Sequence, residues 1–99
     1  MTLGISSRRS TLVYRAQLSD PAAKFVKSLA ARDAALAREL ALLLISLEHD
    51  PEPPGSRELL PSLSAVVKGE RVWERPPFVI IYAVSTRDRL VEIGTVEMY

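Results

Sequence analysis

Hydrophobic and polar residues alternate near the start of the chain. In residues 11–18, one face of an extended segment would carry Leu12, Tyr14, Ala16 and Leu18. A period of two predicts a half-buried β-strand. The first ten residues lack this alternation and are predicted to form a flexible tail (1–10), ahead of one domain spanning residues 11–99.

After residue 18 the apolar spacing becomes helical. Asp20 is the expected N-cap of a first helix, because Pro21 follows it and proline is favoured at the first helical position. A second helix is predicted to begin at Asp33. It carries an apolar stripe at positions i, i+4, i+7, i+8 and i+11, namely Leu36, Leu40, Leu43, Leu44 and Leu47. We therefore expect two antiparallel helices whose leucine stripe faces the core.

The second half of the chain is strand-like. Prolines and a glycine in residues 49–56 end the helix, and residues 57–63 are predicted to form a helical turn or an extended link. Three strands are expected in residues 64–75, 78–85 and 89–99. The middle strand is apolar at nearly every position, which predicts a central strand covered on both faces or nearly so. The resulting fold class is α+β, β-α-α-β-β-β, with the helical pair packed on a small, mainly antiparallel sheet.

The composition of the chain excludes several kinds of functional site. The 99 residues have a net charge of +1, which argues against non-specific coating of nucleic acid. The absence of cysteine excludes disulfides and Cys-ligated metals, and a single histidine excludes a multi-His metal site. No cofactor is implied. The longest apolar stretch, residues 41–47, is too short for a membrane span. We expect a soluble, cytoplasmic protein without a membrane partner.

Two segments resemble the RelE/ParE superfamily of toxins from bacterial type II toxin–antitoxin systems. The first is LEHDPEPPGSRELLP, residues 47–61, which resembles the family's helix end, Pro-Gly-Ser linker and docking leucine. The second is FVIIYAVSTRDRLVEIGTVEMY, residues 78–99, which resembles its aromatic–Arg–Val–Ile–Tyr strand, tight turn and closing strand. With the first strand, the resemblance covers about residues 11–99. It implies growth inhibition, plasmid stabilisation and a cognate antitoxin as partner, and leaves open a heterotetramer with that antitoxin.

The sequence departs from the family at the positions that matter for catalysis. In ribosome-dependent members that cleave mRNA, an arginine usually follows the aromatic residue of the central strand, where this chain has Val79. A basic residue or histidine often follows the glycine of the closing strand. After Gly94 this chain has Thr95, Val96 and Glu97 instead.

Cleavage of RNA by its own 2′-hydroxyl needs a base, an acid and a cation for the phosphate. The candidate catalytic residues are Glu74 as base and Tyr99 as acid, although Tyr99 also suits an anchor for the last strand. The candidate target-binding residues are Arg57, Arg71, Trp73 and Arg75, with Lys68 as a further cation. His49 is expected to complement the dipole at the end of the second helix.

Residues 71, 73 and 75 share one face of a strand. Trp73 would thus lie between two guanidinium groups, as a platform for a base or a peptide. The alternative is an edge strand with a half-buried tryptophan and with arginines that are solvated or paired to Glu70 and Glu74. The pattern leaves both interpretations open.

Three candidate functions follow. The net charge, Val79 and the missing basic residue after Gly94 favour a ParE-like toxin that binds DNA gyrase and needs no catalytic residues. The alternatives are a RelE-like, ribosome-dependent mRNA endoribonuclease, and a decayed member that only binds its antitoxin.

Overall fold

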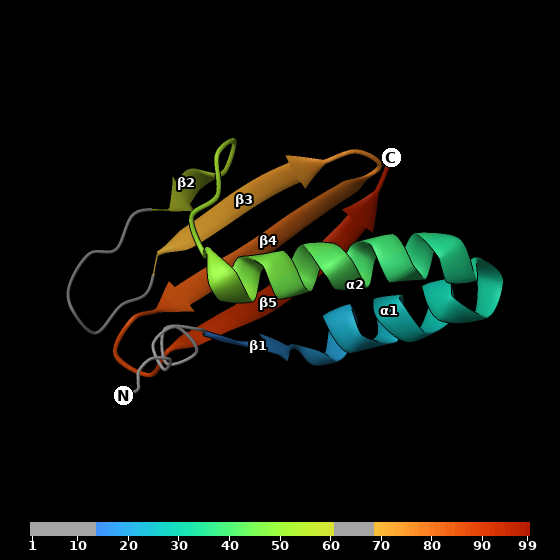
Figure 1. Ribbon diagram of the computed structural model, residues 1–99, viewed down its shortest axis with the longest axis horizontal. Helices are drawn as coiled ribbons and strands as arrows, with labels where there is room; N and C mark the ends of the chain where they lie inside the picture. The colour runs from blue at the N-terminus through green and yellow to red at the C-terminus, as the bar shows by residue number, and fades with distance from the viewer. Residues whose placement is uncertain (1–13, 61–68) are drawn as a thin grey trace, which may run out of the picture.

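The computed structural model describes residues 14–60 and 69–99. Two helices, α1 (Asp20–Arg32) and α2 (Ala34–His49), form an antiparallel pair on one face of a five-stranded sheet (Figure 1). The strands are β1 (Arg15–Leu18), β2 (Arg57–Leu60), β3 (Glu70–Arg75), β4 (Phe78–Ser85) and β5 (Leu90–Met98). Their order in the sheet is β1-β5-β4-β3-β2, and only the β1–β5 pairing is parallel. The predicted α+β fold is therefore confirmed.

The helix starts are set by side-chain caps. The hydroxyl of Ser19 accepts a hydrogen bond from the backbone N–H of Ala22 at 3.2 Å, so Ser19 is the N-cap of α1. The prediction of Asp20 was wrong by one residue; its carboxylate lies in the first turn, where it favours the helix dipole. Asp33 caps α2 as predicted, because its carboxylate accepts from the backbone N–H of Leu36 at 3.1 Å.

The hydrophobic core lies between the helices and the central strands. Three leucines of the predicted stripe, Leu40, Leu44 and Leu47, are buried, and Leu36 and Leu43 pack at its margin. The sheet contributes the buried side chains of Phe78, Ile80, Tyr82, Val91, Ile93 and Val96. Full burial of one such side chain contributes about 1.5–3 kcal/mol, so this contact is the main source of stability. The predicted core role of the stripe is confirmed.

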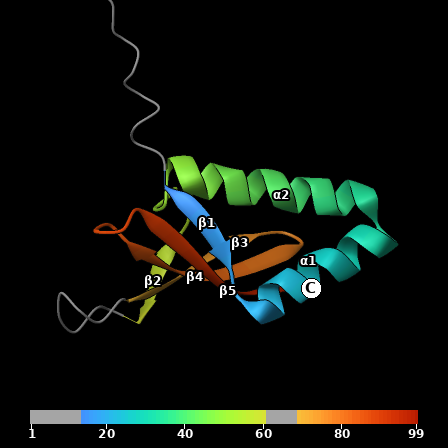
Figure 2. The ribbon, with the colours of Figure 1, turned by 90° about the horizontal axis from the view of Figure 1, so that it is seen from below.

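One expectation about the strands was wrong, and a second holds only in part. Residues 57–60 form β2, which pairs with β3, so β3 is an inner strand and the sheet has one strand more than expected. The central strand β4 is fully covered on one face only. Val79, Ile81 and Ala83 stay half-buried on the other face, because no described helix packs there (Figure 2). The predicted tail 1–10, the first part of the 11–18 strand, and residues 61–68 with Lys68 lie outside the described residues.

A β-bulge in β5 sets which residues face the core. Ile81 pairs with Thr95 and Tyr82 pairs with Ile93, so Gly94 is the extra residue on β5. The hydroxyl of Ser19 donates a hydrogen bond to the carbonyl of Gly94 at 2.6 Å. This bond joins the start of α1 to the bulge.

The outer edge of β1 is covered by the end of α2. The backbone N–H of Tyr14 donates to the carbonyl of Glu48 at 2.8 Å. The next outward N–H, that of Ala16, donates to the Glu48 carboxylate at 2.7 Å. One glutamate thus satisfies two N–H groups of an edge strand that would otherwise be open to pairing. In the described ranges, no helix is long and apolar enough to cross a membrane.

Candidate functional site

The predicted site residues divide between the two faces of the sheet. The register pairs Arg71 with Tyr82 and Trp73 with Ile80, which places both on the face that the helices cover. Arg57 pairs with Val72 and therefore belongs to the opposite face, together with Glu74. The predicted residues do not converge on one site.

Arg71 lies beneath the loop that follows α2. Its Nη2 donates a hydrogen bond to Ser56 Oγ at 2.9 Å, and Ser56 Oγ donates to the carbonyl of Pro53 at 2.8 Å. The hydroxyl of Tyr82 donates to the carbonyl of Pro51 at 2.7 Å. These bonds hold the proline-rich loop against the sheet. The sequence pattern of the central strand gave no sign of this polar link between Tyr82 and the loop.

The hydroxyl of Tyr82 is the group with a shifted pKa in this cluster. Burial raises its pKa above the ordinary value of 10.0, and hydrogen bonding with Ser56 and Arg71 acts in the opposite direction. The hydroxyl is thus held neutral and serves as a donor. This arrangement stabilises the loop and supplies no base.

Trp73 is a core residue with Arg75 above it. Its side chain is 5% exposed, and the Arg75 guanidinium lies 5.7 Å from the centre of the indole ring. The expected half-buried edge position was wrong, because β2 covers the outer side of β3. Arg75 is exposed and available to a target, whereas Trp73 is buried. The target-binding role of both residues stays a prediction.

Arg57 and Glu74 form an ion pair at 3.8 Å, with 62% and 55% of their side chains exposed. Such a pair contributes about 0–1 kcal/mol at most, because water screens it. The ion pair nonetheless places the nearest candidate cation, Arg57, against the carboxylate of the candidate base, Glu74. Within residues 14–60 and 69–99, no group of three or more potential ligand side chains could hold a metal ion.

The open face of the sheet carries carboxylates around Val79, the position where the resemblance described from the sequence would place an arginine. Val79 pairs with Glu74 of β3 on one side and with Glu97 of β5 on the other. An apolar side chain between two carboxylates does not attract a phosphate. The carboxylates of Glu74 and Glu97 repel a phosphate.

The remaining candidates lie at the ends of elements. Tyr99 is 71% exposed, and its backbone N–H donates to the carbonyl of Pro77 at 3.0 Å, which ties down the end of β5. That bond fits the expected anchor and leaves the phenol free to act elsewhere. His49 is exposed in the last turn of α2, where a positive charge is favourable.

Solved structures share this fold. A chain of the archaeal RelE–RelB complex from Pyrococcus horikoshii OT3 is similar with a TM-score of 0.72 and 19% identity, covering 87% of this chain and 94% of that one. A chain of the toxin–antitoxin complex RelBE2 from Mycobacterium tuberculosis is similar with a TM-score of 0.67 and 15% identity, covering 89% and 93%. No protein-family model matches the sequence, and no curated protein matches it significantly. The RelE-like fold expected from the sequence is confirmed.

Proposed function

We propose that this chain is the toxin of a bacterial type II toxin–antitoxin system and that it arrests growth by binding DNA gyrase, as ParE-like toxins do. The RelE-like fold supports the toxin role, because the two similar structures described above come from such complexes. The proposed partner is a cognate antitoxin in the cytoplasm.

The row Glu74–Val79–Glu97 is the observation that favours gyrase binding over RNA cleavage. A ribonuclease needs a cation beside the scissile phosphate, worth several kcal/mol of transition-state stabilisation. In this sheet the central position of the row is apolar and its neighbours are anionic. Arg57, the nearest described cation by register, is paired with Glu74. Inhibition by contact with a protein target requires none of these groups.

An apolar strip on α2 supports an antitoxin partner. Leu42 and Ile45 lie three residues apart on the helix, with 60% and 48% of their side chains exposed. Neither belongs to the leucine stripe that packs on the sheet. An antitoxin segment that covered both side chains would remove exposed apolar area from water.

The test is induced expression in bacteria without antitoxin, with labelled methionine and labelled thymidine followed over the first minutes. We expect thymidine incorporation to fall first and the purified chain to inhibit supercoiling by gyrase. A matched control is Leu40→Asp, because Leu40 is fully buried and a charge there prevents folding. An early fall in methionine alone would overturn the gyrase mechanism. Continued growth with neither label affected would leave a decayed chain that only binds antitoxin.

The second candidate is a RelE-like mRNA endoribonuclease, which the likeness to chains of RelE complexes favours. Its base would be Glu74 and its acid Tyr99. If methionine incorporation falls first, the double variant Glu74→Gln, Tyr99→Phe should abolish that fall. Both side chains are exposed, so the variant should fold normally.

A further inference from the structure

The open face of the sheet has a regular pattern of carboxylates around an apolar centre. Three successive outward residues of β4, Val79, Ile81 and Ala83, are half-buried. Ala83 pairs with Glu70 of β3 and Glu92 of β5. Four residues away, Val79 pairs with Glu74 and Glu97 in the same way. The face is therefore an apolar ridge with a column on each side that contains two glutamates, separated by Val72 on β3 and by Thr95 on β5.

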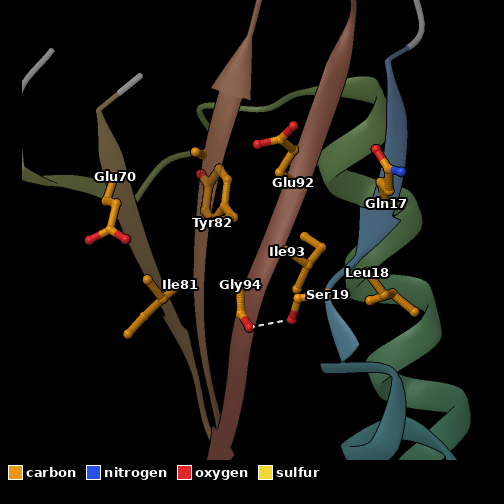
Figure 3. Close-up of a pocket in the computed structure, with 10 residues that line it drawn as sticks. Gln17, Leu18, Ser19, Glu70, Ile81, Tyr82, Glu92, Ile93 and Gly94 are labelled. Carbon is orange, nitrogen blue, oxygen red and sulfur yellow. Dashed lines mark hydrogen bonds between the residues drawn. The ribbon is translucent and has the colours of Figure 1, made fainter. Parts of the chain in front are cut away.

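A concavity lies at one end of this ridge. It has a volume of about 420 Å³, and its lining includes Glu70, Ile81, Ala83, Glu92 and Gln17 (Figure 3). In this view the helices lie behind the strands, so the concavity opens away from the helix-covered core. Its lining contains two carboxylates and no lysine or arginine among the described residues.

Two of the four glutamates are without a charged partner in the part of the chain that the structure describes. Glu74 is paired with Arg57, and Glu92 has an interaction of its own. Glu70 and Glu97 have no side-chain hydrogen bond or ion pair with residues 14–60 or 69–99. They lie on opposite flanks of the ridge and at its opposite ends. A ligand that contacts both must span the face.

We propose that this face is a docking surface for a basic amphipathic helix of a partner protein, with Glu70 and Glu97 as its anchors. The chemistry of this face selects the ligand. The half-buried apolar ridge favours apolar side chains, and the flanking carboxylates favour lysine or arginine and repel a phosphate backbone. The inference goes beyond the proposed function and does not depend on gyrase as the target.

The dimensions of the face match one helix. Neighbouring strands lie about 4.8 Å apart, so the two glutamate columns are about 10 Å apart, which is about the diameter of an α-helix. The two glutamate rows are four residues apart, or about 13 Å along β4, which corresponds to about nine helical residues. A helix of three turns therefore places apolar residues on the ridge and basic residues over both columns.

The test measures binding of a fluorescein-labelled, 18-residue Leu/Lys amphipathic peptide to the purified chain by fluorescence anisotropy. We expect the double variant Glu70→Gln, Glu97→Gln to bind the peptide about tenfold more weakly. Each of the two exposed ion pairs that it loses contributes a factor of about two to five in affinity. The matched control is Glu39→Gln, Glu58→Gln, with the same change in charge. Both control residues are exposed, Glu39 on α2 and Glu58 opposite Arg71 on the other face. The control should bind the peptide as the wild type does.

A second variant, Ala83→Lys, places a cation between Glu70 and Glu92. We expect it to abolish peptide binding without lowering the melting temperature, because the new ammonium pairs with the carboxylates. Equal loss of binding in the control variant, or equal binding of a Leu/Glu twin of the peptide, would overturn the proposal. The proposal would also be overturned if an RNA oligomer competed with the peptide and bound Ala83→Lys as well as it binds the wild type. Growth arrest is scored separately, so failure of the gyrase mechanism and failure of the docking surface are distinguishable.

Discussion

Glu48 is the residue whose removal tests the edge of the sheet most directly. Its carboxylate accepts a hydrogen bond from the backbone N–H of Ala16 at 2.7 Å. A hydrogen bond to a charged group contributes about 1.5–3 kcal/mol. A carboxylate in the last turn of a helix costs about 0.3–1 kcal/mol, because it faces the negative end of the helix dipole. The difference predicts that Glu48→Ala lowers the free energy of unfolding by about 1–2 kcal/mol.

The conservative variant separates the bond from the charge. Glu48→Gln keeps an acceptor for the N–H of Ala16 and removes the unfavourable charge at the end of α2, so its free energy of unfolding should stay within about 0.5 kcal/mol of the wild type. A decrease of 1 kcal/mol corresponds to a melting temperature lower by about 4–8 °C in a domain of this size. Glu48→Ala should therefore melt about 4–16 °C lower than the wild type.

The assay is urea unfolding followed by the fluorescence of Trp73, the only tryptophan of the chain. Glu39→Ala is the matched control, because it removes an exposed glutamate from the same helix. The reasoning fails if Glu48→Ala is as stable as Glu39→Ala. A stable variant would mean that water satisfies the N–H of Ala16 as well as the carboxylate does.

Further predictions concern the cap, the buried phenol and the arginines. Ser19→Ala loses both the cap of α1 and the bond to Gly94, and should lower the free energy of unfolding by about 1–2 kcal/mol in the same assay. Because burial raises the pKa of Tyr82, the folded chain keeps a proton that the unfolded chain releases above pH 10.0. Stability should be unaffected by this group at lower pH and fall as pH rises through the folded pKa, and a pH series of urea midpoints should show no such fall in Tyr82→Phe. Arg71→Ala with Arg75→Ala should weaken growth arrest while antitoxin binding, measured by calorimetry, stays within about threefold; unchanged arrest would remove both arginines from the target surface.

Much of the fold follows from local pattern. The alternation before residue 18, the helical spacing of the leucines and the proline-rich break each act over a few residues, where backbone propensity and burial of one face decide the outcome. The cap of α1 was predicted one residue too late in the chain. Ser19 and Asp20 are both good caps, and only the geometry selects between them. The strand β2 was missed because its four residues, RELL, carry no alternation. Its pairing with β3 makes it a strand.

The candidate site was less predictable. Sequence placed Arg57, Arg71 and Arg75 in one set of cations, whereas the sheet separates Arg57 from the other two by its two faces. Trp73 has the same neighbours in the chain whether it is exposed or buried. Its burial depends on the helices and on the loop at Gly55, which are distant in sequence.

The sequence by itself determined the order of the two helices and of the four strands other than β2, the leucine core and the presence of valine instead of arginine at position 79, because these are properties of single positions and short periods. Only the tertiary structure decided which carboxylates surround Val79 and Ala83. Those neighbours depend on the register of three strands and on the bulge at Gly94. A shift of one residue would turn every one of these side chains to the opposite face. That register depends on cross-strand packing between distant segments, which no local pattern encodes.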